Sequence, residues 1–317
     1  MADLNPPVLA LTHLCVHLPT ASGTVQAVVD FNLTVSQGEK WCLLGESGCG
    51  KTILALSLLK LLPAGARISG SIRVCGKQIL CLSARQLRYL RGREVAMIFE
   101  QPASCLDPLY TIGDQVAEAV QVLEKINRRA AREKALDLLA RVRLPDPRNR
   151  ARQYPHELSG GMIQKVMIAM TLARKPKLII ADEPTTALDV SVQIQIIDLF
   201  HSILEETGAS LLLISHDPDT ARNLCQNAAV MYAGRMLEKG RLADLFQAPR
   251  HPYTKSLFEA LSGEYPRPIP GRVPSLISHF PGCAFHPRCT KALPLCRKKE
   301  PAFRGNTRCH RLIPCSA

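Results

Sequence analysis

The sequence KWCLLGESGCGKTILALSLL at residues 40–59 decides the fold. A short apolar run, Lys40–Leu44, leads into a segment that fits the pattern G-x-x-x-x-G-K-[ST], and an apolar helical pattern follows. Glycines let backbone N–H groups converge on phosphate oxygens, and the helix that starts near Lys51 directs its positive end at the same anion. The pattern predicts a phosphate-binding loop made of Gly45, Glu46, Ser47, Gly48, Cys49, Gly50, Lys51 and Thr52.

A matching acidic site lies downstream of this loop. We expect Lys51 to bridge the β- and γ-phosphates of a nucleotide and the Thr52 hydroxyl to bind Mg²⁺. The apolar run Leu178–Ala181 predicts a strand, and Asp182 at its end is placed to hold Mg²⁺ through water. Glu183 follows, where a carboxylate can accept the proton of water that attacks the γ-phosphate. Together the two motifs predict a site that hydrolyses a nucleoside triphosphate.

The rest of the chain fits an α/β architecture, because short apolar runs alternate with amphipathic stretches. Residues 8–36 and 68–80 alternate and contain glycine turns, which indicates an antiparallel flap beside a buried parallel sheet. Residues 112–142 carry apolar side chains at helical spacing and predict a helical insertion within about 103–158. A proline-rich, loop-rich appendage follows. We expect two domains, at 1–245 and 246–317.

Composition and charge set further limits. The 317 residues are 46% hydrophobic, and no apolar run reaches the length of a membrane span. The first residues show no basic signal-peptide region, so we expect a cytosolic protein that meets membranes only through a partner. The net charge of +13 suits an anionic partner such as nucleic acid or a membrane surface, and equally a solvated surface.

Three further motifs identify a family. Leu158-Ser159-Gly160-Gly161-Met162 lies between the two sites, Ala187-Leu188-Asp189 follows the acidic pair, and His216 follows the apolar run Leu211–Ser215. With these motifs in this order, the chain resembles the nucleotide-binding subunit of an ABC-type transporter over nearly its whole length. The resemblance implies a P-loop NTPase core that works as a head-to-tail pair.

The same resemblance implies roles for the residues of these motifs. ATP on one subunit would be closed over by Ser159, Gly160 and Gly161 of the other. Asp189 would act at the dimer seam, and His216 would contact the γ-phosphate and the attacking water.

The sequence departs from the family pattern at two places. The order Phe99-Glu100-Gln101-Pro102 puts Glu100 where the family has a glutamine that contacts Mg²⁺, so either Glu100 or Gln101 would serve. Residues 20–24 contain no aromatic side chain to stack on adenine, which leaves nucleotide selectivity open.

Other segments resemble the subunits of dipeptide and oligopeptide uptake systems. They are ADEPTTALDV at 181–190, HPYT at 251–254 and a cysteine-bearing tail, while SCLDP at 104–108 is similar to the antimicrobial-peptide branch. Peptide is the implied cargo, and nickel, sugars and antimicrobial peptides are the alternatives. The implied partners are two membrane-spanning permease subunits, a second, non-identical ATP-binding subunit and an extracytoplasmic substrate-binding protein, with no nucleic acid. The implied location is peripheral, at the cytoplasmic face of the inner membrane.

Cysteines crowd the tail. Cys283, Cys289, Cys296 and Cys309 follow the spacing C-x5-C-x6-C-x12-C, with Cys315 outside it. Four thiolates suit a 4Fe–4S cluster or Zn²⁺ equally, and free thiols or a disulfide remain open. The family resemblance implies the iron–sulfur cluster. The other cysteines in apolar surroundings are expected to fill the core: Cys15, Cys42, Cys75, Cys81 and Cys225.

Two other functions compete with transport. A soluble ABC ATPase acting on ribosomes or DNA would suit the basic surface, but such proteins usually carry two cassettes or a long coiled-coil insertion, and this chain has neither. An inactive regulatory cassette is suggested by Glu100 and by the missing stacking aromatic.

Overall fold

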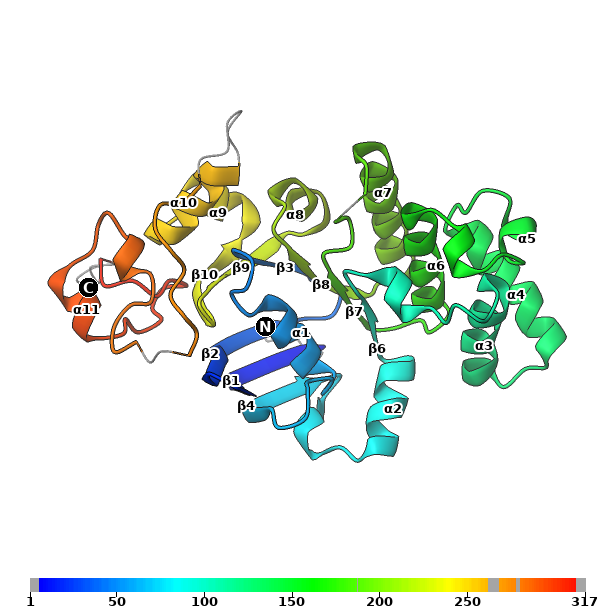
Figure 1. The fold of residues 1–317 in the computed structure, drawn as a ribbon, viewed down its shortest axis with the longest axis horizontal. Helices are drawn as coiled ribbons and strands as arrows, with labels where there is room; N and C mark the ends of the chain where they lie inside the picture. Colours follow the sequence, from blue (N-terminus) through cyan, green and yellow to red (C-terminus); the bar gives the residue numbers. More distant parts are fainter. Residues whose placement is uncertain (1–5, 187, 262–267, 278–279, 312–317) are drawn as a thin grey trace. The chain divides into compact units, whose positions relative to one another are not determined.

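The computed structural model describes residues 6–186, 188–261, 268–277 and 280–311 (Figure 1). The chain divides into two compact units, residues 1–81 with 213–317 and residues 82–212. Among the described residues no helix is both long and apolar enough to cross a membrane.

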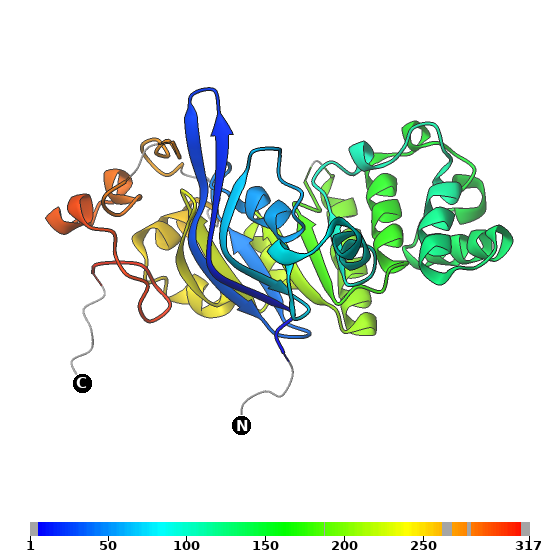
Figure 2. The same ribbon diagram turned by 90° about the horizontal axis from the view of Figure 1, so that it is seen from below.

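An antiparallel sheet in the first unit has the strand order β2-β1-β4-β5. Its strands are β1 (Leu9–Thr20), β2 (Gly23–Val35), β4 (Arg67–Val74) and β5 (Lys77–Gln78). Figure 2 shows β1 and β2 as a long dark blue hairpin, whose register pairs Thr20 with Gly23 beside the turn. Leu14 and Phe31 are fully buried on this hairpin, so the flap predicted from the alternating sequence is anchored in the core.

A second set of strands in this unit carries the phosphate-binding loop. Strand β3 (Lys40–Leu44) runs parallel to β9 (Asn227–Tyr232), and β10 (Arg235–Arg241) pairs antiparallel with β9. Leu43 and Leu44 are fully buried, as the continuous apolar run of a parallel strand requires. The helices of this part of the unit are α1 (Lys51–Leu58), α8 (Pro218–Leu224) and α9 (Leu242–Gln247), with the short η1 (Ile79–Cys81).

The C-terminal appendage packs on the same unit through aromatic rings. Tyr232 of β9, Tyr253 of α10 (Pro252–Leu261) and Phe285 of the tail have ring centroids 4.6–5.3 Å apart. Each ring buries a large apolar area, so this cluster holds the tail against the core. Two short helices follow, η4 (His286–Arg288) and α11 (Pro294–Lys298). The appendage is thus less irregular than its sequence predicts, because α10 is a ten-residue helix.

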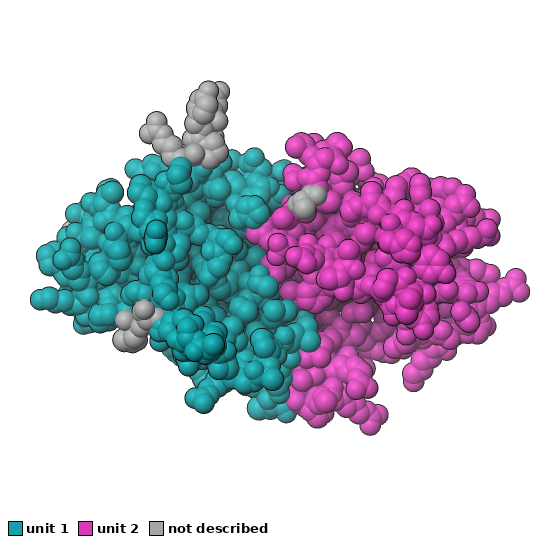
Figure 3. Space-filling view, in the orientation of Figure 1, with its two compact units in different colours: residues 1–81, 213–317 teal, residues 82–212 magenta. Residues whose placement is uncertain are grey.

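The second unit, magenta in Figure 3, is mostly helical. Its strands β6 (Val95–Ile98) and β7 (Leu178–Asp182) run parallel, with Ile98 opposite Ala181. The predicted insertion forms α3 (Ile112–Glu124) and α4 (Arg128–Arg141), whose N-caps are Thr111 and Asn127. The remaining helices are α2 (Ala84–Arg93), η2 (Pro102–Cys105), α5 (Pro147–Arg150), η3 (Pro155–Glu157), α6 (Gly160–Leu172) and α7 (Val190–Thr207). Strand β8 (Ser210–Ser215) crosses the boundary between the units.

The prediction that five cysteines fill the core is correct only in part. Cys42 and Cys225 are buried, but Cys15 and Cys75 are half-buried and Cys81 is exposed. Cys81 ends the turn η1, where the chain leaves the sheet, so an apolar neighbourhood in the sequence did not mean burial.

Candidate functional site

The phosphate-binding loop joins β3 to α1 in the first unit, as its sequence predicts. Gly50 is the N-cap of α1 and has φ +110°, a conformation that side chains disfavour. A Cβ at Gly50 would lie 2.1 Å from the carbonyl oxygen of Ala27. The loop therefore requires glycine here both for its backbone conformation and for the close approach of β2.

Lys51 is buried within the loop. Its ammonium donates hydrogen bonds to the carbonyl oxygens of Gly45, at 2.8 Å, and Glu46, at 3.0 Å. Neighbouring Cys49 is also fully buried, and burial raises the pKa of its thiol. The loop thus carries a cation at the N-terminus of a helix, which is the electrostatic arrangement that binds a phosphate anion.

Two residues from the C-terminal part of the chain hold Glu46, the second residue of the loop. The backbone N–H of Glu46 donates to the hydroxyl of Tyr253, at 3.0 Å. Its carboxylate accepts two hydrogen bonds from the guanidinium of Arg288, at 2.7 and 2.9 Å. The sequence reasoning missed both contacts. HPYT at 251–254 was visible as a motif and Arg288 directly precedes Cys289, but nothing in the local sequence connected either of them with the loop.

His216 follows β8 in the first unit and is exposed. The next residue, Asp217, caps α8 by accepting N–H bonds from Asp219 and Thr220, each at 3.0 Å. The turn that carries His216 is therefore fixed by a strand on one side and a capped helix on the other.

The acidic pair lies in the second unit, at the end of β7. Asp182 is 2% exposed, while Glu183 is half-buried with φ +48°. The left-handed region is uncommon for a side chain such as glutamate and costs about 1–2 kcal/mol. The hydroxyl of Thr186 donates to the Glu183 carboxylate at 3.2 Å. Strain of this kind is typical of functional sites, because the surrounding structure must enforce it.

Residues 158–162, here termed the signature turn, begin α6 in the second unit. Ser159 is the N-cap of the helix, and its hydroxyl accepts the N–H of Met162 at 3.4 Å. A Cβ at Gly161 would lie 2.6 Å from Cγ1 of Val192 on α7, whereas one at Gly160 would meet nothing closer than 3.8 Å. The turn therefore presents the N-terminus of a helix, with one glycine required by a neighbouring helix.

The N-terminus of α7 is capped by Asp189. Its carboxylate accepts hydrogen bonds from the Ser191 hydroxyl, at 2.7 Å, and the Val192 N–H, at 3.0 Å, and these bonds lower the pKa of Asp189. The Gln193 amide donates to the carbonyl oxygens of Thr185 and Leu188, at 3.2 and 3.1 Å. Asp189 is thus ionised and the loop before it is held by its own helix. Ala187 lies outside the described residues.

Glu100 and Gln101, the two candidates for the family's magnesium-contacting glutamine, are both exposed in the second unit. The Gln101 carbonyl oxygen accepts the N–H of Ser104 at 3.2 Å and the Ser104 hydroxyl at 2.7 Å. The backbone carbonyl group of Gln101 is therefore used by the turn η2. The side chains of Glu100 and Gln101 both remain candidates for contacting Mg²⁺.

The four predicted cluster cysteines belong to one neighbourhood of the first unit. The pKa of the Cys283 thiol is raised to about 11, mainly by burial and to a lesser extent by the nearby Cys296, Cys309 and Cys289. Yet among the described residues no group of three or more His, Cys, Asp or Glu side chains is arranged to hold a metal ion. As placed, these four thiols do not form a ligand set, so the structure does not support the predicted metal cluster. Cys315 lies outside the described residues.

Sequence comparisons agree with these motifs. Residues 28–186 match the ABC transporter family, and residues 237–296 match the family described as "Oligopeptide/dipeptide transporter, C-terminal region". The "Probable peptide ABC transporter ATP-binding protein y4tR" of Sinorhizobium fredii is 44% identical over 95% of this chain and 92% of its own length. The "Dipeptide transport ATP-binding protein DppD" of Bacillus subtilis is 42% identical over 93% of this chain and 90% of its own length.

Solved structures show the same fold. The ATP-binding cassette MJ0796, in a dimeric structure bound to ADP and Pi, is similar with a TM-score of 0.66 and 26% identity, over 74% of this chain and 98% of the cassette. The cbiO1 protein of Clostridium perfringens, part of the transporter complex cbiONQ, gives a TM-score of 0.65 at 26% identity, over 76% and 91% of the two chains.

Proposed function

This chain belongs to the ABC transporter family of ATP-hydrolysing subunits, and from that premise we propose that it powers the import of peptides. The observation that supports peptides as the cargo is the match of residues 237–296 to the C-terminal region of oligopeptide and dipeptide transporters. That segment includes Tyr253 and Arg288, which form hydrogen bonds with Glu46 of the predicted phosphate-binding loop, and this link between the subfamily segment and the loop supports the proposal.

Hydrolysis is assigned to the residues of the two sites. The loop N–H groups and Lys51 bind the β- and γ-phosphates, and the Thr52 hydroxyl and Asp182 are the oxygen donors that would hold Mg²⁺, with Glu100 or Gln101. The metal supplies neutralisation of phosphate charge when it is bound. Glu183 accepts a proton from the attacking water, whose oxygen bonds to the γ-phosphorus. The bond from that phosphorus to the β–γ bridging oxygen breaks, and ADP and inorganic phosphate are the products.

Dimer closure would couple this chemistry to transport. The signature turn of a second, non-identical cassette would present a serine hydroxyl and backbone N–H groups to the γ-phosphate bound by this chain. Ser159, Gly160 and Gly161 of this chain would do the same for ATP bound by that cassette. His216 would contact the γ-phosphate and the attacking water, and Asp189 would act at the seam. Two permease subunits and an extracytoplasmic substrate-binding protein complete the complex, with this chain peripheral at the cytoplasmic face of the membrane.

Uptake by cells tests the proposal. Cells that lack this protein are complemented with wild type or with Glu183→Gln, and uptake of labelled dipeptides and oligopeptides is measured beside the ATPase rate of the purified complex. We expect only the wild type to restore uptake, and the variant to lower kcat at least about hundredfold, because a general base contributes that much.

The outcomes separate cargo from chemistry. If wild type hydrolyses ATP but restores no peptide uptake, the peptide assignment is wrong, and labelled nickel, sugars and antimicrobial peptides are tested next. If Glu183→Gln turns over ATP at the wild-type rate, Glu183 is not the base.

We propose separately that the tail cysteines bind a metal after a local rearrangement. Two observations support this proposal. Cys289, Cys296 and Cys309 lie close enough to Cys283 to affect its pKa, and the chain resembles the peptide-transporter subfamily. Thiolates are the ligands that iron–sulfur clusters and structural zinc require.

Metal analysis of anaerobically purified protein tests this second proposal. We expect iron, or zinc as the alternative, bound in wild type and lost in Cys289→Ser, while ATP binding survives in both. Cys81→Ser is the matched control, because Cys81 is exposed and outside the tail. Full metal content in Cys289→Ser, or none in wild type, would exclude the site.

A further inference from the structure

Glu46 introduces a negative charge into a loop that binds anions. It is the second residue of the phosphate-binding loop, and its carboxylate would repel the phosphates of a nucleotide if it were unpaired. The Glu46 side chain is 25% exposed, so water and salt screen only part of this repulsion.

Arg288 cancels this charge. Its guanidinium meets the Glu46 carboxylate with two parallel hydrogen bonds, and its side chain is only 3% exposed. The same guanidinium donates to the carbonyl oxygens of Ile269, at 2.8 Å, and Pro270, at 2.9 Å. Two guanidinium hydrogen bonds thus hold the loop carboxylate, and two more hold backbone carbonyl groups of the C-terminal appendage.

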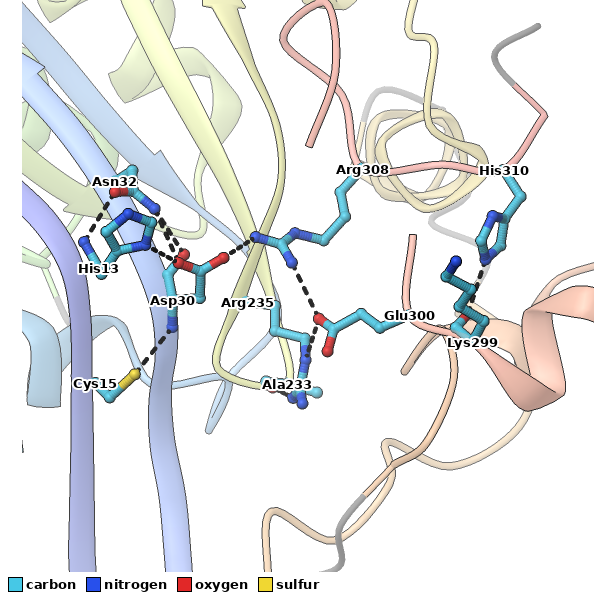
Figure 4. A network of polar contacts seen from close by, with 10 residues as sticks. All are labelled: His13, Cys15, Asp30, Asn32, Ala233, Arg235, Lys299, Glu300, Arg308 and His310. Carbon is cyan, nitrogen blue, oxygen red and sulfur yellow. Dashed lines mark hydrogen bonds and ion pairs between the residues drawn. The ribbon is translucent and has the colours of Figure 1, made fainter. Parts of the chain in front are cut away.

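A second buried arginine of the appendage provides a comparison. Arg308 also precedes a cysteine, its side chain is 8% exposed, and it pairs with Asp30 at 2.9 Å and Glu300 at 3.1 Å. Figure 4 shows this network, in which Glu300 also pairs with Arg235 of β10. Arg308 therefore attaches the tail to the β-sheet residues without touching the phosphate-binding loop, whereas Arg288 attaches it to the loop itself.

We propose that Arg288 is a positioning residue for nucleotide binding: by neutralising and orienting Glu46, it makes the affinity of the loop for ATP depend on the C-terminal appendage. The inference rests on nucleotide binding at this loop and does not depend on which cargo is transported. It assigns to the appendage, beyond its attachment to the fold, an electrostatic part in the ATP site.

A set of four full-length variants tests the inference. Binding of a fluorescent ATP analogue is measured for Arg288→Met, Glu46→Gln, the double variant and Arg308→Met, and KM and kcat are measured for the same proteins. We expect Arg288→Met to weaken binding at least about tenfold, because it leaves a carboxylate unpaired in an anion site. The loss falls on KM, with kcat close to wild type, since the chemical groups are untouched.

Charge rescue separates neutralisation from packing. The double variant removes both charges and is expected to bind within about threefold of wild type, although it lacks the same arginine contacts. Raising the ionic strength should shrink the defect of Arg288→Met, because salt screens repulsion between exposed charges. Arg308→Met is expected to lower thermal stability while leaving nucleotide affinity at the wild-type level.

Three results would overturn the inference. They are wild-type affinity in Arg288→Met, an equal loss in Arg308→Met, and a double variant as weak as Arg288→Met. If Arg288→Met does not fold, Arg288→Lys is used instead, which keeps the charge but loses the two-bond geometry, and a loss greater than about tenfold there would contradict neutralisation. A wild-type chain that binds no ATP would instead remove the family-level premise.

Discussion

The phosphate-binding loop and the signature turn present similar helix N-termini, but they are supported in opposite ways. The signature turn is held by the Ser159 cap of its own helix α6, and Gly161 packs closely against Val192 of α7 in the same unit. The phosphate-binding loop is held from far along the chain, by Tyr253 and by Arg288, which lies 242 residues from Glu46. A local support folds with its own helix, whereas a remote one makes the loop depend on the appendage.

The largest loss of ATP affinity and stability is expected at Gly50, where the phosphate-binding loop packs too closely against β2 to accept a Cβ atom. Gly50→Ala places a Cβ 2.1 Å from the Ala27 carbonyl oxygen and forces φ +110° on alanine, so the loop must move. We expect ATP affinity to fall at least about hundredfold and stability by about 3 kcal/mol. Nucleotide titration and thermal unfolding of the full-length chain measure the two losses.

Gly38→Ala is the matched control for that loss. Gly38 has φ +78° but no atom within 4 Å of an added Cβ, so it reports backbone strain without a clash. It is expected to cost about 1–2 kcal/mol of stability and no ATP affinity. Equal losses in the two variants would mean that the close approach of β2 to the loop is unimportant.

The packing of the signature turn against α7 predicts a smaller loss. Gly161→Ala drives a Cβ into Val192, which is stiff because it is β-branched, and we expect it to cost about 2 kcal/mol of stability. Gly160→Ala, on the same helix, brings a Cβ only to ordinary contact with Leu188 at 3.8 Å, and it is expected to be neutral or to gain up to about 1 kcal/mol, since alanine favours helices. Thermal unfolding compares them, and a gain in both would show that α6 and α7 are not tightly packed at Gly161.

Local sequence was sufficient for most of the fold. The strands β3, β7 and β8 were predicted because each is a short apolar run that ends at a polar motif residue, and the helices α3 and α4 because apolar spacing repeats. The helix α10 was missed in a proline-rich region, although Pro252 is its first residue, which is a position where proline favours helix initiation.

The remote contacts could not be predicted in the same way. A loop glycine or a cap is recognised by residues three or four positions away, but the Glu46–Arg288 pair depends on how the tail returns to the core. The sequence shows a charged residue inside an anion-binding loop without showing what neutralises it. The arrangement of the tail thiols could not be predicted for the same reason, because the spacing of cysteines gives the number of candidate ligands and not their positions in space.

Removing one remote hydrogen bond tests the other support of Glu46. Tyr253→Phe keeps the ring in the aromatic cluster but removes the hydroxyl that accepts the Glu46 N–H. An unsatisfied buried donor costs about 1–2 kcal/mol, so we expect ATP affinity to fall about three- to tenfold. Tyr110→Phe, at an exposed position of the second unit, is the control. Unchanged affinity in Tyr253→Phe would leave Arg288 as the main remote support.

The smallest effect concerns His251, which helps to begin the helix that carries Tyr253. Its Nδ1 accepts the N–H of Tyr253 at 3.0 Å, and burial lowers the pKa of His251 to about 3. Between that value and the ordinary 6.5, the unfolded chain binds a proton that the folded chain does not, so stability falls as pH falls below 6.5. His251 changes the free energy of unfolding by at most about 1.4 kcal/mol per pH unit.

His251→Asn isolates this contribution, because an amide oxygen can accept the same N–H without binding a proton. Between pH 7.5 and about pH 5.5, wild type should lose about 1 kcal/mol more stability than the variant, measured by chemical denaturation at each pH. His156→Asn, at an exposed position, should follow the wild-type curve. Parallel curves for wild type and His251→Asn would mean that His251 is protonated without cost, and that the helix behind the phosphate-binding loop is held more loosely than its buried contacts indicate.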